Sequence, residues 1–126
     1  MASELTKPIT FHGDEKLAEN PQTPLALLQV LAEDDAWEVR WAVAKHPQTP
    51  LALLEVLAKD EEDENVRSAV AAHPQTPLAV LAVLAKDKHE DVRSAVAAHP
   101  QTPLAVLQVL AKDKHEDVRS AVAHRR

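Results

Sequence analysis

The chain has no cysteine and a single glycine, and aromatic residues make up only 2% of its 126 residues. Without cysteine it has no disulfide framework, no cysteine-ligated metal and no thiol nucleophile. One glycine, Gly13, is too few for a loop that cradles phosphates. The shortage of glycine and aromatic residues also argues against a β-sandwich. The apolar content is mostly Ala, Leu and Val, which predicts an all-helical chain.

Long hydrophobic runs and an excess of positive charge are also missing. No run approaches the roughly 20 apolar residues of a membrane span, and the start, MASELTKPITFHGDE, lacks the basic and apolar blocks of a signal peptide. Fourteen basic against twenty acidic residues give a net charge of −6, which disfavours nucleic acid and anionic membranes as partners. We expect a soluble, cytoplasmic protein.

What the sequence does have is an internal repeat. The string PQTP begins at Pro21, Pro47, Pro74 and Pro100, in steps of 26, 27 and 26 residues. The additional residue falls within the acidic stretch DEEDEN, residues 60–65, where an insertion belongs in a loop. A period of this length is typical of solenoids. We predict an N-terminal capping segment, 1–19, followed by four tandem repeats, 20–45, 46–72, 73–98 and 99–126.

Each repeat is expected to hold two short helices. In the third repeat, Thr76 and Pro77 look like a capping hydroxyl followed by proline at the first helical position. Apolar residues, among them Leu78 and Val83, then cover most of the first helix, so we expect it to be buried on more than one side. A D-x-x-E spacing from Asp87 predicts a second helix over residues 90–98.

Two helices of about ten residues cannot bury their apolar faces alone, whereas stacked copies can. The sequence therefore predicts an all-α fold, a solenoid of four helical pairs.

The repeat resembles the leucine-rich repeat variant family of bacterial type, through the pattern N/H-P-x-T-P-x-x-x-L-x-x-L-A-x-D-x-x-x-x-V-R-x-A-V-A. In the first copy the matching residues are Asn20-Pro21-Gln22-Thr23-Pro24, Leu28, Leu31-Ala32, Asp34, Val39-Arg40 and Ala42-Val43-Ala44. The resemblance implies a right-handed superhelix in which one helix of each pair is α and the other tends towards 3₁₀. It implies no settled biochemical role. This chain departs from the pattern by placing His before PQTP in three copies.

The third and fourth copies are unusually alike. The stretch VRSAVAAHPQTPLAVL occurs at residues 66–81 and again at residues 92–107. Such identity indicates either a recent duplication or a deliberately idealised consensus array, and a designed array would have no natural ligand.

Aspartate and arginine recur together in every copy, six residues apart in three copies and seven apart across the insertion. These positions form a set that we call the ladder: Asp34, Arg40, Asp60, Arg67, Asp87, Arg93, Asp113 and Arg119. They are either a strip of charge for a ligand or a structural ladder that runs from unit to unit, and arginine suits the second role because its planar fork holds two acceptors. We favour the structural role. The alternative function, a nucleic-acid-binding helical solenoid, would use the ladder arginines.

Several histidines are candidates for a metal site or a catalytic site. His46, His73 and His99 stand at equivalent places, about 8–10 Å apart in a stack, which is far for shared ligation of an ion. We expect them to cap turns. His89-Glu90-Asp91 resembles acid–base chemistry, but adjacent residues at a helix start point in different directions. We predict no catalytic residue, no metal and no cofactor, and therefore no enzyme.

Residues that differ among the copies are the better candidates for binding. Gln29, Glu55, Ala82 and Gln108 are equivalent and vary, so we expect them to be exposed. Trp37 and Trp41, the only tryptophans, share one helix face. They either anchor a partner peptide or pack against the N-terminal segment and cover the end of the stack; we favour the second.

The last residues, Ala123-His124-Arg125-Arg126, offer nothing polar to replace the surface that a further unit would cover. Solenoids normally need caps at both ends, so self-association through the C-terminal end is a prospect. The function predicted is a non-catalytic repeat scaffold or protein-binding module for a protein or peptide that the sequence does not identify.

Overall fold

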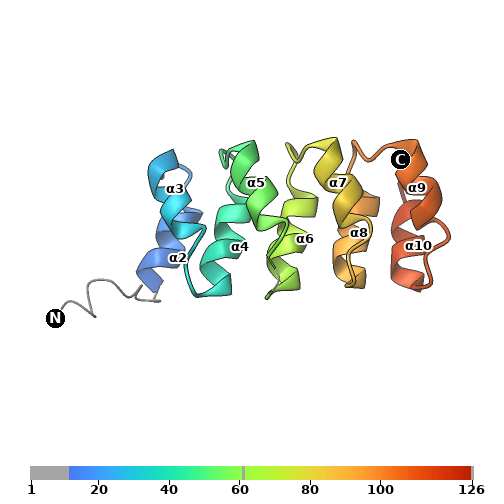
Figure 1. Cartoon of the computed structure of the whole chain (residues 1–126), viewed down its shortest axis with the longest axis horizontal. Helices are drawn as coiled ribbons and strands as arrows, with labels where there is room; N and C mark the ends of the chain where they lie inside the picture. The colour runs from blue at the N-terminus through green and yellow to red at the C-terminus, as the bar shows by residue number, and fades with distance from the viewer. Residues whose placement is uncertain (1–11, 61, 126) are drawn as a thin grey trace.

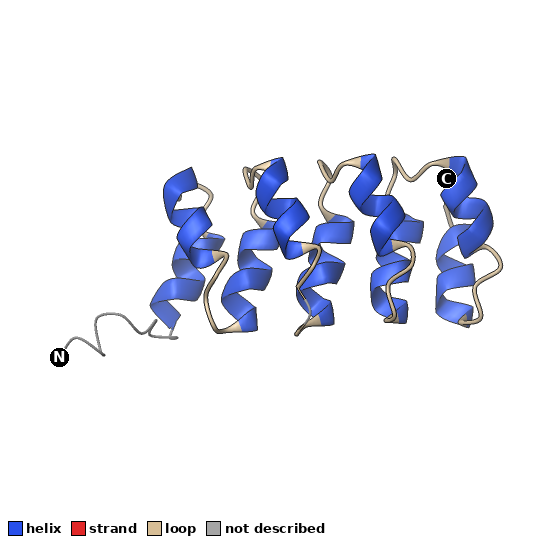
Figure 2. Cartoon of the chain, in the orientation of Figure 1, coloured by secondary structure: helices blue, strands red, loops and turns tan. Residues whose placement is uncertain are grey.

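The computed structural model describes residues 12–60 and 62–125, and within them the chain is helical with no strand (Figure 2). In this part the helices are α2 (His12–Glu19), α3 (Leu25–Leu31), α4 (Trp37–Lys45), α5 (Leu51–Leu57), α6 (Glu64–Ala72), α7 (Leu78–Leu84), α8 (Glu90–Ala98), α9 (Leu104–Leu110) and α10 (Glu116–Ala123). None of these helices is both long and apolar enough to cross a bilayer.

The helices form two parallel rows (Figure 1). The first helices of the units are α3, α5, α7 and α9, and the second helices are α4, α6, α8 and α10, with α2 at the head of the second row. Each second helix packs on the next one in its row, and each first helix contacts the second helices on both sides of it. The chain is therefore an α-solenoid, with α2 and α10 at opposite ends.

Both helices of every described unit are α-helices, so the expectation that one of them tends towards 3₁₀ is wrong. The first helices are seven residues long. Hydrogen bonds that span three residues occur at both ends of α5, from Leu53 N to Pro50 O, from Lys59 N to Val56 O and from Asp60 N to Leu57 O. Ala58 N still donates to Leu54 O across four residues, which is the α pattern.

The threonine before each first helix does not cap it, contrary to expectation. Pro77 is the residue at the N-cap of α7, and Thr76 instead donates its hydroxyl hydrogen to the carbonyl of Val70, near the end of α6. Thr76 is buried between consecutive units. Its hydroxyl therefore satisfies one of the carbonyl groups that the end of a helix leaves without a partner.

The second helix of the third unit spans Glu90–Ala98, as predicted, but its N-terminus is built differently. The N-cap is His89, whose Nδ1 accepts from Asp91 N at 3.0 Å. Asp87 Oδ1 accepts from His89 N at 2.9 Å and thereby fixes the preceding turn. The D-x-x-E spacing predicted the position of the helix correctly because Asp87, its first residue, fixes the turn that precedes the N-cap.

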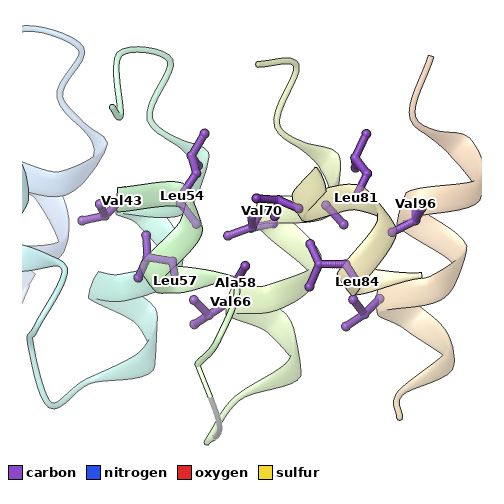
Figure 3. Close-up of a cluster of buried hydrophobic side chains, with 14 of the residues drawn as sticks. Val43, Leu54, Leu57, Ala58, Val66, Val70, Leu81, Leu84 and Val96 are labelled. Atoms are coloured by element: carbon purple, nitrogen blue, oxygen red, sulfur yellow. The ribbon is translucent and has the colours of Figure 1, made fainter. Parts of the chain in front are cut away.

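The core lies between the two rows (Figure 3). Each inner unit contributes two leucines from its first helix and two valines from its second, none more than 2% exposed: Leu54, Leu57, Val66, Val70, Leu81, Leu84, Val92 and Val96. Leu78 and Val83, which we expected to be buried, are 52% and 63% exposed. The first helix buries one side between two second helices and turns the other outwards.

Two details of the repeat boundaries are visible. Helix α5 ends at Leu57 and α6 begins at Glu64, so the additional residue lies in a loop, as predicted. Helix α2 packs against α4 in the way that α4 packs against α6, and it thus stands where the second helix of a preceding unit would stand. The division into a capping segment, 1–19, and four repeats stays a prediction.

Candidate binding surfaces

The outward side of the first helices carries one apolar pattern four times. Each helix exposes the leucine at its first position and the valine at its sixth, with exposed fractions between 50% for Leu25 and 70% for Leu104. We call this set the first-helix face: Leu25, Val30, Leu51, Val56, Leu78, Val83, Leu104 and Val109. Exposed apolar side chains that recur on adjacent elements are typical of an interaction surface.

The variable residues lie within this face. At about 100° per residue, the first and sixth positions bound an arc of roughly 140°, and the fifth position falls between them. That fifth position is Gln29, Glu55, Ala82 or Gln108, and all four are exposed, as predicted. The face is therefore constant at its margins, whereas its fifth position is glutamine in two units, glutamate in one and alanine in one.

Trp37 and Trp41 lie on α4, in the other row. Their rings meet edge to face, with centroids 6.4 Å apart and planes at 69°. Trp41 is partly buried against the core, and Lys45 Nζ stands 3.8 Å from the centroid of its ring, a favourable cation–π arrangement. Trp37 remains 38% exposed. The pair was expected to pack against the N-terminal segment, 1–19, of which residues 1–11 lie outside the described residues.

The ladder joins each unit to the next. Arg40, Arg67 and Arg93 each donate from Nε to Oδ2 of an aspartate 20 residues later, at 2.7 Å. Those aspartates are Asp60, Asp87 and Asp113. The pairs six or seven residues apart that the sequence suggested are also in contact, but through the backbone: Arg93 Nη1 donates to the carbonyl of Asp87 at 2.8 Å. One guanidinium thus bonds to the loop of its own unit and to the loop of the next unit.

The charges within the ladder are matched. The hydrogen bond from Arg93 lowers the pKa of Asp113 below its ordinary value, and the hydrogen bond to Asp87 raises the pKa of Arg67. Arg40, Arg67 and Arg93 are at most 8% exposed. Of the four ladder arginines only Arg119 is exposed, so the series offers phosphates little of the basic stripe that a nucleic-acid reader would need.

The ladder changes at the first unit. Counting 26 residues back from Arg40 leads to Asp14 on α2, so a carboxylate stands where the other units have a guanidinium. Partial burial, a hydrogen bond to the carboxyl group of Asp34 and the charge of Asp34 together raise the pKa of Asp14. Asp34 itself is buried and accepts from Ala36 N at 2.9 Å.

His46, His73 and His99 form a second connection between units. Each is buried and accepts at Nδ1 from the backbone N–H two residues later, at 3.1 Å. This arrangement leaves the proton on Nε2, which donates to the carbonyl of the equivalent residue one unit earlier, as from His73 to His46 at 2.9 Å. Both ring nitrogens are engaged within the protein, in turns at helix C-termini.

Arg125 continues the histidine series at the last unit. It stands 26 residues after His99, at the position of the histidines. Its Nη1 donates to the carbonyls of Ala97 and His99, each at 2.6 Å, and its Nη2 to that of Pro100 at 3.3 Å. The end of α8 is therefore closed by an arginine in the place of an imidazole.

His89, Glu90 and Asp91 converge, contrary to the expectation that adjacent side chains diverge. One possible ligand atom of each lies within 4.8 Å of the others. They can do so because His89 precedes the helix and is not part of its first turn. Its Nδ1 accepts the backbone N–H of Asp91, and its Nε2 faces Glu64 Oε1 at 3.9 Å. His115 repeats the arrangement with Glu90 at 4.0 Å, which fits a joint between units.

Sequence reasoning missed the first-helix face, Arg125 and Asp14. The face was missed because Leu78 and Val83 look like core residues in a seven-residue helix. Their angular positions around the helix axis would have indicated exposure, since they lie on the side opposite Leu81 and Leu84. Arg125 and Asp14 lie outside the PQTP pattern. Counting the 26-residue period outwards from His99 and Arg40 would have found both.

Comparison with protein families gives one match. The model of the leucine-rich repeat variant domain matches twice, at residues 12–73 and 65–126. Searches of curated proteins and of solved structures found no match. The two segments together cover every helix described above, and the first begins with α2. The chain belongs to the leucine-rich repeat variant family.

Proposed function

We propose that the chain is a non-catalytic protein-binding scaffold and that a segment of the partner protein lies along the first-helix face. The observation that carries the proposal is the exposure of a leucine and a valine in all four first helices. Eight apolar side chains in register on one row form a surface whose burial by a partner is favourable, at about 25 cal/mol per Å² of apolar area.

The variable residues support the same surface. Gln29, Glu55 and Gln108 offer hydrogen-bonding groups in three units, whereas Ala82 offers none. An apolar margin supplies affinity, and polar groups at fixed places select the partner's side chains. The second row offers less, because Trp41 already contacts Lys45 and the core, and the aromatic pair does not continue into Glu64 and Ser68 of the next unit.

A peptide library displayed on phage and selected on the purified protein tests the proposal. We expect enriched peptides with apolar side chains. The double variant Val56→Lys and Val83→Lys should weaken them at least tenfold, because it places two ammonium groups in the apolar contact. The affinity is measured by fluorescence anisotropy of synthetic copies.

The matched control is Trp37→Ala, which removes an exposed apolar side chain from the other row. It should leave the affinity of the selected peptides within about twofold. Enriched peptides that lose affinity with Trp37→Ala but bind the valine variant normally would overturn the proposal, and so would a library that yields no binder.

A further inference from the structure

A hollow borders the first-helix face between the second and third units. It has a volume of about 640 Å³, and its lining includes Val83 of the face and two exposed lysines, Lys59 and Lys88. The other charged residues that the structure describes in its wall belong to the ladder: Asp60, Arg67 and Asp87. An exposed valine and two ammonium groups therefore stand side by side at this edge of the face.

The two lysine positions recur in the later units. We call the resulting set the lysine rim: Lys59, Lys86, Lys88, Lys112 and Lys114. All five are exposed. By the repeat, Val109 has Lys86 and Lys114 at the places that the two lysines of the hollow have beside Val83. The rim therefore follows the first-helix face across α7 and α9.

The charge of the rim is not neutralised by the residues that the structure describes. None of them forms an ion pair with a rim lysine. The one acid in each of the two loops that follow α7 and α9, Asp87 and Asp113, accepts from a ladder arginine. Glu90 and Asp91, at the start of α8, face histidines. Helices α7 and α9 themselves contain no charged residue.

The sign of the charge is opposite at the first unit. Its two rim positions hold Glu33 and Asp35, both exposed. Glu33 lines a pocket together with Val30, so it borders the face as the lysines do further on. The first-helix face therefore keeps its leucines and valines from end to end, while the charge along its edge changes from acidic at α3 to basic at α7 and α9.

We propose that the partner segment bound to the first-helix face is acidic where it crosses α7 and α9. Its apolar side chains contact Val83 and Val109, and its carboxylates contact the lysine rim. The acidic edge at α3 repels those carboxylates, so the segment lies on the stack in one direction. The exposed valines favour a protein over nucleic acid, because a phosphate backbone gains nothing from apolar contact.

The inference rests on the proposed function for the location of the partner and adds the charge of that partner. A defined probe tests it without a selected binder. The probe is a short acetylated peptide amide in which pairs of leucines alternate with pairs of glutamates, and its control has glutamine in place of every glutamate. Both are titrated at low salt into the methyl-labelled protein and followed by NMR, because salt screens exposed charges.

We expect the glutamate peptide to shift the methyl groups of Val83, Leu104 and Val109 in a saturable way, with smaller shifts at Val30. A Kd on the order of 1 mM is normal for a short flexible ligand. The glutamine peptide has the same apolar side chains and should bind about fivefold more weakly, since it lacks the ion pairs to the rim.

Variants locate the charge. Lys86→Gln combined with Lys114→Gln should weaken the glutamate peptide about fivefold, because two exposed ion pairs are lost. The fold should be unaffected, since neither side chain has an ion-pair partner among the described residues. The matched control is Lys16→Gln combined with Lys45→Gln, which removes the same charge from exposed positions in the other row and should leave the Kd within about twofold.

The outcomes separate the two proposals. Equal affinity of the glutamate and glutamine peptides, an unchanged Kd in the rim variant, or no binding of either peptide overturns the inference, and the first of these needs only the parent protein. Charge-dependent binding that leaves the valine methyl groups unshifted overturns the proposed function and keeps the rim as a carboxylate site. Duplex DNA or phosphatidylserine vesicles that bind the rim more tightly than the glutamate peptide overturn the choice of a protein partner.

Discussion

At the residue scale, the histidine that distinguishes three copies from the family pattern has a physical reason. Asn20, which keeps the pattern, accepts from Gln22 N through Oδ1 at 2.8 Å. His73 makes the same turn bond through Nδ1, and its longer side chain also reaches the carbonyl of His46 in the previous unit. Histidine therefore adds a connection between units to a turn that asparagine can already make.

This comparison predicts an order of stability at position 73. His73→Asn should keep the bond from Gln75 N and lose the bond to His46, at a cost of about 1 kcal/mol in free energy of unfolding. His73→Ala loses both bonds and should cost about 2–3 kcal/mol. Urea denaturation followed by circular dichroism measures the two costs. Equal costs would show that the turn bond contributes nothing.

Most of these residue roles could be predicted from the sequence, but not which neighbouring unit each side chain bonds to. The spacing identified Asp87 and Arg93 as ladder residues and Gln29 as exposed. It paired Asp87 with the arginine of its own unit, whereas the carboxylate accepts from Arg67 of the previous one. Which neighbour a long side chain reaches depends on how units stack, and a sequence period does not contain that geometry.

At the element scale, α2 has the place of a second helix without the residue that would bind it into the ladder. The other second helices carry an arginine at this position, and α2 carries Asp14. The period predicted where a helix at this end would pack. It could not show that Asp14 faces Asp34, because the contact depends on the loop that returns from α3.

A pH dependence follows from this contact. The pKa of Asp14 is raised above its ordinary value of 3.8 by burial and by Asp34, and Glu33 lines one pocket together with both of these carboxyl groups. Protonated Asp14 therefore favours the folded state. This contribution is complete below pH 3.8 and is lost as the pH rises through the folded-state pKa.

Asp14→Asn removes the charge at every pH. We expect it to be more stable than the parent at pH 7, by about 1 kcal/mol or less for a pair near the surface, with the difference shrinking as the pH approaches 3.8. Melting temperatures between pH 3.5 and 7 provide the measurement. Parallel curves for the two proteins would contradict this account, and Asp91→Asn, far from Asp34, serves as the control.

At the scale of the whole molecule, burial depends on having a neighbour on each side. Leu81 in the third unit is fully buried, whereas its equivalent Leu107 in the fourth is only partly buried. Val96 and Val122 differ in the same way. The stability of such an array is close to a sum over units and the interfaces between them, so the fourth unit rests on one interface where the third has two.

Matched leucine substitutions test this description. Leu81→Ala should cost about 3 kcal/mol in free energy of unfolding, because it empties a site closed on all sides. Leu107→Ala makes the same chemical change and should cost about 1 kcal/mol. Urea denaturation of both variants gives the comparison. A larger loss for Leu107→Ala would mean that the fourth unit is covered in solution, as self-association through that end would require.

No bond of the ladder or of the histidine series reaches beyond the adjacent unit. The stretch at residues 66–81 also recurs, without change, at residues 92–107. Removing or duplicating the 26 codons between these two copies keeps the reading frame, and each arginine and histidine at the new junction then meets an equivalent partner. The number of units can thus change in a single genetic step, lengthening or shortening the scaffold while every interface keeps its residues.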